Sequence, residues 1–339
     1  MEKNKMGSRP QMKAIVCPKY GSADVLKYQD VPKPTPDDYE ILIRVQASSI
    51  NSADLHVMKA DPFLVRLAFG MFKPAHPILG ADVAGVVEMV GSRVTQFKPG
   101  DEVFGDLSGR NWGGFAEYAS ARADSVAIKP VNLTFQQAAA IPLAGVTALQ
   151  GLRDVGKIKP GQKVLVYGAG GGVGTFLIQL AKFFGTIVTA ACHPSKLEKL
   201  KELDIDFVLD YTKDDFTRNG QLKYDIICDV GGKKSLREFT SSLSENGTYI
   251  LFGDSISKVL KLQTFGSSSL LFGNKESQAL KSFLATPKKE DLTYLKQLCE
   301  NEKIKPIIDR VFALNEVPQA IQYLESGKAL GKIVISIGT

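Results

Sequence analysis

An α/β protein is expected from this sequence, with a doubly wound parallel sheet joined to a second domain that is rich in β-structure. Short strand patterns separated by Pro, Gly, Asn and Asp fill the chain up to about residue 130. From there on strands alternate with helices, which is the order that builds a parallel sheet covered by helices on both faces. A chain of 339 residues is also long for a single core, so two domains are expected.

The first part of the β-rich domain is predicted over residues 1–133. Its strands are expected at 13–18, 28–31, 41–47, 80–90, 97–104 (after an initial turn), 113–119 and 125–129. A helical turn is expected at 54–59, with Asp54 as its cap. The segment 61–77 is apolar and irregular and contains Phe63 and Phe72. It either packs in the core or covers a pocket, and its aromatic side chains suggest an apolar substrate.

The parallel-sheet domain is predicted over residues 134–273, and a return to the β-rich domain over residues 274–339. Thr134 suits the N-cap of the first helix. Helices are expected at 134–141, 145–155, 171–184, 195–203 and from residue 235 onward. Strands are expected at 163–167, 186–191, 207–210, 224–229 and 248–252, with one more considered at 270–272. The sequence after residue 274 predicts a helix at 291–300, a strand at 307–312, a helix at 316–326 and a strand at 332–337.

The stretch from Lys163 to Lys182 places a glycine-rich turn between a buried strand and an amphipathic helix. Its register is A-x-G-x-x-G, with Ala169, Gly171 and Gly174 at the three defining positions. Glycines let a pyrophosphate approach the backbone, and the bare N–H groups and the dipole of a helix N-terminus favour an anion there. Flexible glycine linkers do not lie between a strand and a helix, so the pattern predicts the dinucleotide site of a Rossmann fold.

Composition limits the other functions that need to be considered. The net charge of +6 is spread along the chain without a basic block, so no nucleic-acid partner is expected. The four cysteines lie far apart with no C-x-x-C pair, which favours neither disulfides nor a cysteine-built zinc site and fits a reducing cytoplasm. The sequence contains no long apolar span and no signal-peptide pattern, so no membrane partner is expected.

Several phrases occur together in a fixed order: GADVAGVV from Gly80, FKPGDEVFG from Phe97, GGFAEYA from Gly113, IPLAGVTAL from Ile141 and GKIVI from Gly331. With the glycine turn between the last two, they resemble the medium-chain dehydrogenase/reductase superfamily from about Met12 to the end of the sequence. Within it, the chain is similar to the zinc-free branch of quinone oxidoreductases and enone (alkenal/one) oxidoreductases. The resemblance implies a GroES-like catalytic domain, a Rossmann domain inserted after its first part, and a homodimer paired through an edge strand near Leu270.

The resemblance also allows the positions of the catalytic zinc ligands to be compared with this sequence. Zinc alcohol dehydrogenases of the superfamily bind their catalytic zinc with a cysteine, a histidine and a further cysteine. The matching positions here are Asn51, Ala81 and Leu143, whose side chains do not supply the three donors that a catalytic zinc needs. No metal site is therefore expected. The resemblance implies hydride addition to a quinone or a conjugated C=C bond.

Cofactor choice is predicted from the end of the second Rossmann strand, where NAD-specific folds carry an acidic residue for the ribose 2′-OH. No carboxylate follows that strand here, and Ser195 and Lys196 are suited to a 2′-phosphate. Tyr211 follows at a spacing similar to the Lys–Tyr pair that holds this phosphate in the quinone oxidoreductase branch. NADPH is the expected cofactor. The alternative for Lys196 is a solvated helix face, because Lys199 and Lys201 follow it.

The resemblance implies further cofactor contacts on the glycine turn, on later strands and in the closing phrase. Together with Ser195, Lys196 and Tyr211, the expected set is Thr147, Ala169, Gly171, Gly172, Val173, Gly174, Asp229, Phe252, Gly253 and Lys332. The expected catalytic group is the Asn51 amide, as a donor that stabilises enolate charge in the manner of an oxyanion hole.

Several functions compete for this sequence. The first is an NADPH-dependent enone or alkenal reductase, and the second is an NADPH:quinone oxidoreductase, each acting on a small apolar substrate. The third is an NADPH-binding protein without turnover, since one fold hosts many functions. An NADPH-dependent carbonyl or alcohol oxidoreductase is a further alternative.

Overall fold

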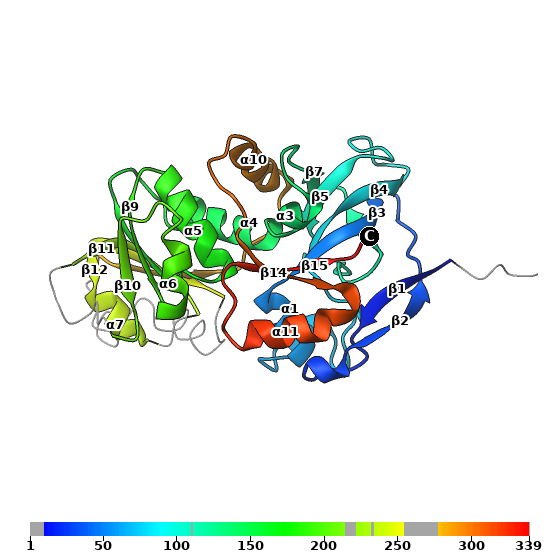
Figure 1. Ribbon diagram of the computed structural model, residues 1–339, viewed down its shortest axis with the longest axis horizontal. Helices are drawn as coiled ribbons and strands as arrows, with labels where there is room; N and C mark the ends of the chain where they lie inside the picture. The colour runs from blue at the N-terminus through cyan, green and yellow to red at the C-terminus, as the bar shows by residue number, and fades with distance from the viewer. Residues whose placement is uncertain (1–9, 110, 214–221, 232–233, 254–276, 339) are drawn as a thin grey trace, which may run out of the picture.

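The computed structural model describes residues 10–109, 111–213, 222–231, 234–253 and 277–338. Two sheet-based domains lie side by side along the long axis of the molecule (Figure 1). One is built on a six-stranded sheet, and the other on a seven-stranded sheet with a two-stranded sheet beside it. Across these described ranges, no helix combines the length and the apolar character that crossing a bilayer requires.

The six-stranded sheet is parallel and has the order β10-β9-β8-β11-β12-β13. Its strands are β8 (Lys163–Tyr167), β9 (Ile187–Cys192), β10 (Phe207–Asp210), β11 (Tyr224–Val230), β12 (Leu243–Phe252) and β13 (Ala279–Phe283). The chain runs outward from β8 to one edge, returns to the centre and then runs to the other edge, so the strand order reverses between β8 and β11. The predicted doubly wound sheet is confirmed.

Both faces of this sheet are buried. Successive side chains of a strand point to opposite faces, so neighbouring residues of β8 show what covers each face. Val164 and Val166 of β8 pack in the same cluster as helix α5 (Gly172–Phe183), helix α4 (Pro142–Gln150) and helix α10 (Lys289–Glu300). Leu165 and Tyr167 pack on the other face with Phe239 of helix α7 (Leu236–Ser241). Helix α6 (Pro194–Leu200) connects β9 to β10.

The second domain is largely antiparallel. Its sheet has the order β14-β15-β3-β4-β5-β7, and β6 also pairs with β3. The strands are β3 (Glu40–Ile50), β4 (Asp82–Val90), β5 (Glu102–Asp106), β6 (Tyr118–Arg122), β7 (Val126–Ile128), β14 (Ile308–Ala313) and β15 (Lys332–Ser336), with β1 (Gln11–Val16) and β2 (Lys27–Pro32) forming the separate pair. The helices here are α1 (Ser52–Lys59), α2 (Val65–Phe69), α3 (Phe135–Ala139) and α11 (Val317–Glu325). The expected β-rich domain is confirmed.

Some details differ from the expectations. The helix predicted at 145–155 begins earlier, at Pro142, because proline is well tolerated in the first turn of a helix, and it continues into a π-helical turn over Gly151–Val155. β13 follows the expected domain boundary at residue 273, yet it pairs with β12. The boundary between the second and third parts therefore stays a prediction. The strand considered at 270–272 and the dimer edge near Leu270 lie outside the described residues.

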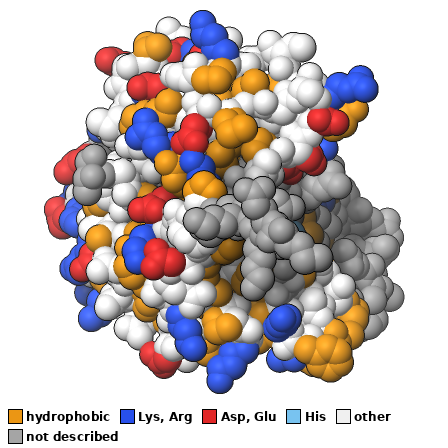
Figure 2. All heavy atoms as spheres, turned by 90° about the vertical axis from the view of Figure 1, so that its right-hand side faces the viewer, with side chains coloured by type: hydrophobic (Ala, Val, Ile, Leu, Met, Phe, Trp, Pro, Cys, Tyr) orange, Lys and Arg blue, Asp and Glu red, His pale blue; other side chains and the backbone are white. Residues whose placement is uncertain are grey.

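Charge is mixed on the face that Figure 2 presents, which is the right-hand side of the molecule in Figure 1. Lys and Arg side chains are interspersed there with Asp, Glu and apolar groups.

Candidate functional site

The carboxyl edge of the parallel sheet brings together most of the residues predicted to bind the cofactor. These are Ala169, Gly171, Gly172, Val173 and Gly174 after β8, Ser195 and Lys196 after β9, Tyr211 after β10, Asp229 near the end of β11, and Phe252 and Gly253 at the end of β12. They meet because every strand of a parallel sheet presents its carboxyl end on the same side.

The turn after β8 has close contacts at its last glycine and open space at its middle one. A Cβ atom on Gly174 would lie 2.4 Å from the carbonyl oxygen of Gly168, so glycine lets helix α5 pack directly on the turn. Gly171 is the extended residue before the helix, and a Cβ atom there would meet nothing closer than 3.5 Å. An anion can therefore approach the first N–H groups of α5.

Lys196 lies against this turn. A Cβ atom on Gly170 would be 2.6 Å from Lys196 Cδ, so the aliphatic part of the lysine covers the glycine. Burial lowers the pKa of the Lys196 ammonium group, while Cys192 and Asp309 act in the opposite direction. A half-buried lysine beside a helix N-terminus is suited to binding phosphate.

The other two candidates for phosphate recognition lie next to Lys196. Ser195 Oγ is 2.8 Å from His193 Nδ1, and the His193 ring packs edge-on against Tyr211 with centroids 6.3 Å apart. Tyr211 also stacks on Tyr167 at 5.4 Å. The structure thus brings Ser195, Lys196 and Tyr211 to one corner of the sheet, although β9 and β10 carry them separately.

Three predicted contacts have side chains that pack in the protein. The buried Asp229 carboxylate accepts a hydrogen bond from Tyr249 Oη at 2.7 Å. Phe252 packs edge-on against Phe283 at 5.4 Å, and Val173 packs against the main core cluster. At Gly253 φ is +49°, and no atom of the described residues lies within 4 Å of the position that a Cβ would take.

Thr147 lies on the more exposed face of α4. Seven of the nine residues of this helix are buried, and the two that are half-buried are Leu143 and Thr147. They are four residues apart and so share a face. The N–H group of Leu143 donates to Asp82 Oδ1 at 2.8 Å, which places Thr147 one turn from this contact.

Asp82, which is fully buried, is the centre of a polar network. Its Oδ2 atom accepts hydrogen bonds from the Ser49 hydroxyl, from Asn51 Nδ2 at 2.8 Å and from Lys332 Nζ at 3.2 Å. Its Oδ1 atom accepts the Leu143 N–H. One carboxylate therefore joins the end of β3, the start of α4 and the start of β15.

Lys332 connects this network to the glycine turn. Its side chain is 3% exposed, and its ammonium group donates to Asn51 Oδ1 as well as to Asp82. The residue before it, Gly331, forms a parallel bridge with Gly171. The backbone of Lys332 thus lies beside the predicted pyrophosphate turn, whereas its ammonium group points to the catalytic-domain side.

The Asn51 amide is held from both sides. Its oxygen accepts from Lys332, and its nitrogen donates to Asp82 at 2.8 Å and to the Ser49 carbonyl at 3.4 Å. A separation of 3.4 Å is long for an N–H···O hydrogen bond, so one amide proton is weakly held.

Two further carboxylates lie near this network. Asp54 takes part in capping α1 as predicted, but the helix begins earlier, at Ser52, with Asn51 as the N-cap and Asp54 in the first turn. The Asp54 oxygens accept the N–H groups of Asn51 at 2.7 Å and of Gly80 at 3.0 Å. Burial is the largest cause that raises the pKa of Asp54 to about 7; Asp82 acts in the same direction, and the hydrogen bonds from Asn51 and Gly80 oppose it. Burial likewise raises the pKa of Asp106 to about 7, with Asp82 as the next contributor. The nearby Lys332 ammonium group lowers the pKa of both carboxyl groups, but burial outweighs it, so each carboxyl group binds a proton when the pH falls below about 7.

The role of Asp82 was missed from the sequence, as were those of Ser49 and Asp106. The phrase GADVAGVV offers one signal, because an acidic residue at the start of a buried apolar strand needs a partner. That partner, Lys332, lies 250 residues away.

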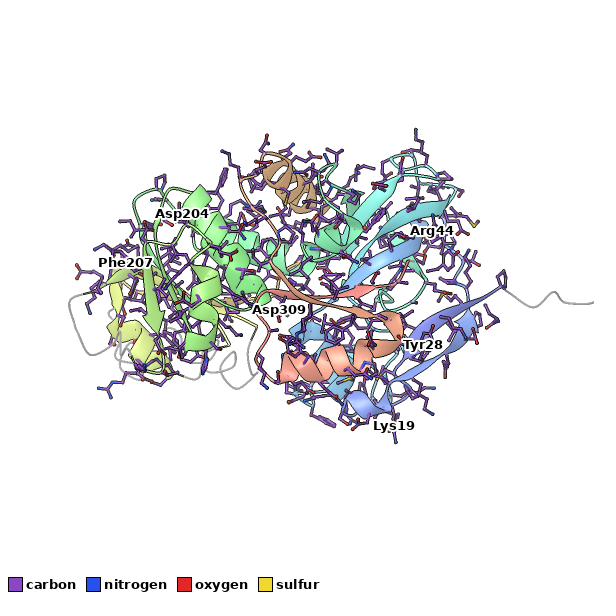
Figure 3. The ribbon with its side chains drawn as sticks, in the orientation of Figure 1. Lys19, Tyr28, Arg44, Asp204, Phe207 and Asp309 are labelled. Carbon is purple, nitrogen blue, oxygen red and sulfur yellow. The ribbon has the colours of Figure 1, made fainter. Side chains whose placement is uncertain are left out.

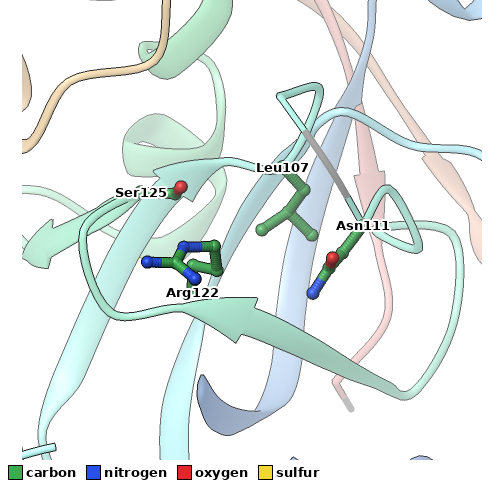
Figure 4. Close-up of a pocket in the computed structure, with 4 residues that line it drawn as sticks. All are labelled: Leu107, Asn111, Arg122 and Ser125. Carbon is green, nitrogen blue, oxygen red and sulfur yellow. The ribbon is translucent and has the colours of Figure 1, made fainter. Parts of the chain in front are cut away.

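A small depression on the same domain is lined by Leu107, Asn111, Arg122 and Ser125 (Figure 4). It contains none of the predicted site residues. Among the residues that the structure describes, no group of three or more His, Cys, Asp or Glu side chains is arranged to hold a metal ion.

Replacing Asp82 by Asn should lower the free energy of unfolding by about 3–5 kcal/mol, because the buried Lys332 ammonium group then faces an uncharged amide. Urea unfolding measures the change. Asp30→Asn is the matched control, since it removes an exposed ion pair with Lys13 and should cost less than about 1 kcal/mol. Equal effects of the two substitutions would contradict the central role of Asp82.

Asp106→Asn should weaken the pH dependence of stability. A carboxyl group with a folded pKa of about 7 and an unfolded value of 3.8 binds a proton mainly in the folded state between these values. The wild-type free energy of unfolding should therefore fall as pH rises from about 4 to about 7, by roughly 1 kcal/mol per pH unit for each such group. Urea unfolding across this range should show a shallower decline in the variant.

The control for this experiment is Asp204→Asn, which changes a carboxylate that is 86% exposed on the other domain (Figure 3). It should keep the wild-type profile. If the free energy of unfolding of Asp106→Asn fell with pH as steeply as that of the wild type, Asp106 would not be the group that binds the proton.

Two protein families match the chain: the alcohol dehydrogenase GroES-like domain over residues 37–131 and the zinc-binding dehydrogenase over residues 203–335. The chain is 37% identical to 2-methylene-furan-3-one reductase from Solanum lycopersicum, over 96% of this chain and 79% of the relative. It is 33% identical, with the same coverage, to the chloroplastic NADPH-dependent alkenal/one oxidoreductase of Arabidopsis thaliana. The solved structure of the quinone oxidoreductase from Coxiella burnetii matches with a TM-score of 0.85 at 30% identity, over 96% of this chain and 99% of that one. The chain therefore belongs to the medium-chain dehydrogenase/reductase superfamily, in the branch of quinone and enone oxidoreductases.

Proposed function

We propose that the protein transfers hydride from NADPH to a quinone, or to the conjugated C=C bond of an α,β-unsaturated carbonyl compound, without a metal ion. The main support is that Lys332 joins an amide donor, Asn51, to the glycine turn of a Rossmann sheet. The relatives named above act as reductases or oxidoreductases on furanones, alkenals, enones or quinones by their names, which points to the same substrate class here.

The carboxyl edge of the parallel sheet fits a phosphorylated dinucleotide. The backbone leaves room at Gly171, as a close approach of the cofactor requires. Ser195, Lys196 and Tyr211 would hold the 2′-phosphate, with the lysine supplying the charge. We infer NADPH rather than NADH from this corner, and NADPH is the cofactor named for one relative.

When bound, the cofactor supplies the hydride, which is added to the β-carbon of the substrate. Negative charge then develops on the carbonyl oxygen. The weakly held proton of the Asn51 amide would stabilise that charge, and the Lys332 ammonium group on the amide oxygen makes the N–H a stronger donor. Water or a nearby acid completes the reduction by protonating the α-carbon.

Turnover assays test the proposal. NADPH oxidation should be coupled to reduction of a soluble quinone or to conversion of an enone into its saturated ketone. Tight NADPH binding without turnover on either class would favour a binding protein. A preference for NAD with simple alcohols would favour the carbonyl or alcohol oxidoreductase.

We further infer a cytoplasmic homodimer. The four free, buried cysteines support a reducing compartment. Relatives named as chloroplastic or mitochondrial show that other members of the branch lie elsewhere, so cell fractionation is the direct test. Light scattering on the purified protein tests the dimer.

Lys196→Ala should weaken NADPH binding about 10- to 100-fold and NADH binding much less, because the charge-assisted contact is made only with the 2′-phosphate. Titration of the two cofactors measures the ratio. Lys199→Ala is the matched control, since Lys199 lies on the same helix, is 65% exposed and contacts Asp309. Equal losses for NADPH and NADH would remove Lys196 from phosphate recognition.

Asn51→Ala should lower kcat about 100-fold while leaving NADPH affinity unchanged, because the donor acts on charge that forms only in the transition state. Steady-state kinetics and cofactor titration separate the two effects. The neighbouring exposed residue provides the control, and Ser52→Ala should retain wild-type kcat. Unchanged turnover in the Asn51 variant would refute its role as the donor.

A further inference from the structure

The segment between α1 and β4 exposes an unusual number of large apolar side chains. We call this group the apolar tip. It consists of Phe63, Leu64, Leu67, Met71 and Phe72, whose exposed fractions are 65%, 49%, 66%, 44% and 89%. Scattered exposed apolar residues are common on proteins, but a cluster of five within ten residues indicates a binding surface.

The apolar tip projects from a folded support. Phe69 packs edge-on against the buried Trp112 ring at 5.8 Å, so it fills the inward side of α2. The Tyr20 hydroxyl donates to the Gly70 carbonyl at 2.5 Å and fixes the end of this helix. Because these inward positions are occupied by Phe69 and its neighbours, the remaining apolar groups face outward.

Three basic residues lie beside the apolar tip. The Arg66 guanidinium group lies 4.8 Å above the Tyr20 ring and 5.3 Å from the Phe63 ring. Lys73 directly follows Phe72 and is exposed, and the exposed Lys19 precedes Tyr20. Asp61 is the one acidic residue in the sequence from 61 to 73. Figure 3 shows Lys19 at the lower edge of this domain.

We propose that the apolar tip docks on the surface of a membrane that contains anionic lipid. Aromatic and leucine side chains surrounded by Lys and Arg are typical of segments that lie in the headgroup region of a bilayer. The contact is peripheral and requires no spanning helix. It goes beyond the proposed reductase activity, and it would place the enzyme where apolar quinones and enones accumulate.

Vesicle flotation tests the proposal with the full-length protein. It should float with phosphatidylcholine vesicles that contain about 30% phosphatidylglycerol and float much less with pure phosphatidylcholine, because each cation near an anionic surface adds about fivefold to binding. Lys73→Ser should therefore lower binding to the anionic vesicles only.

Phe72→Ser should lower the fraction of protein bound to vesicles about tenfold, because serine has no aromatic ring to transfer from water into the membrane surface. Phe207→Ser is the matched control, because Phe207 is 58% exposed and lies on the far side of the other domain (Figure 3). Thermal unfolding confirms that each variant is folded.

Three results would overturn the proposal. In the first, the wild type stays unbound with anionic vesicles. In the second, Phe207→Ser reduces flotation as much as Phe72→Ser does. In the third, Phe72→Ser changes the oligomeric state in the absence of lipid, which would assign the apolar tip to a second copy of this chain.

Discussion

The ion pair between Lys332 and Asp82 is the interaction on which the arrangement of the site depends. Both side chains are almost completely buried, and such a pair is favourable only when its remaining donors and acceptors are satisfied. Ser49, Asn51 and the Leu143 backbone meet that requirement. The pair therefore fixes one geometry among three segments that are far apart in sequence.

This geometry links the two halves of the proposed chemistry. On one side, Gly331 and Gly171 bring the closing strand against the turn that is suited to pyrophosphate. On the other, Lys332 holds the Asn51 amide that is suited to a developing oxyanion. A preorganised donor costs no rearrangement at the moment of reaction, which is why a rigid buried network suits this role. Burial raises the pKa of Asp54 and of Asp106 to about 7, so protonation below this pH reduces the repulsion among three neighbouring carboxylates.

The sequence predicted the fold well because its periodic patterns are local. The strand at Lys163–Tyr167, the strand at Phe207–Asp210 and the capping of α1 by Asp54 all follow from spacing within a few residues. The cluster of Ser195, Lys196 and Tyr211 could also be anticipated, because parallel strands end on one side. The pairing of Asp82 with Lys332 could not be derived in this way, since no local pattern relates residues 250 positions apart. The exposure of Phe72 was not predictable either, because aromatic residues in an irregular segment are usually buried.

The long separation between Asp82 and Lys332 also constrains how the protein matures. During synthesis the strand that carries Asp82 leaves the ribosome well before Lys332 is made, and the Rossmann segment emerges between the two. Without β15, the Asp82 carboxylate would lack its counterion in the interior of the first domain. The closing strand β15 therefore completes the polar network of a domain whose strands β1 to β7 precede the Rossmann segment in the sequence.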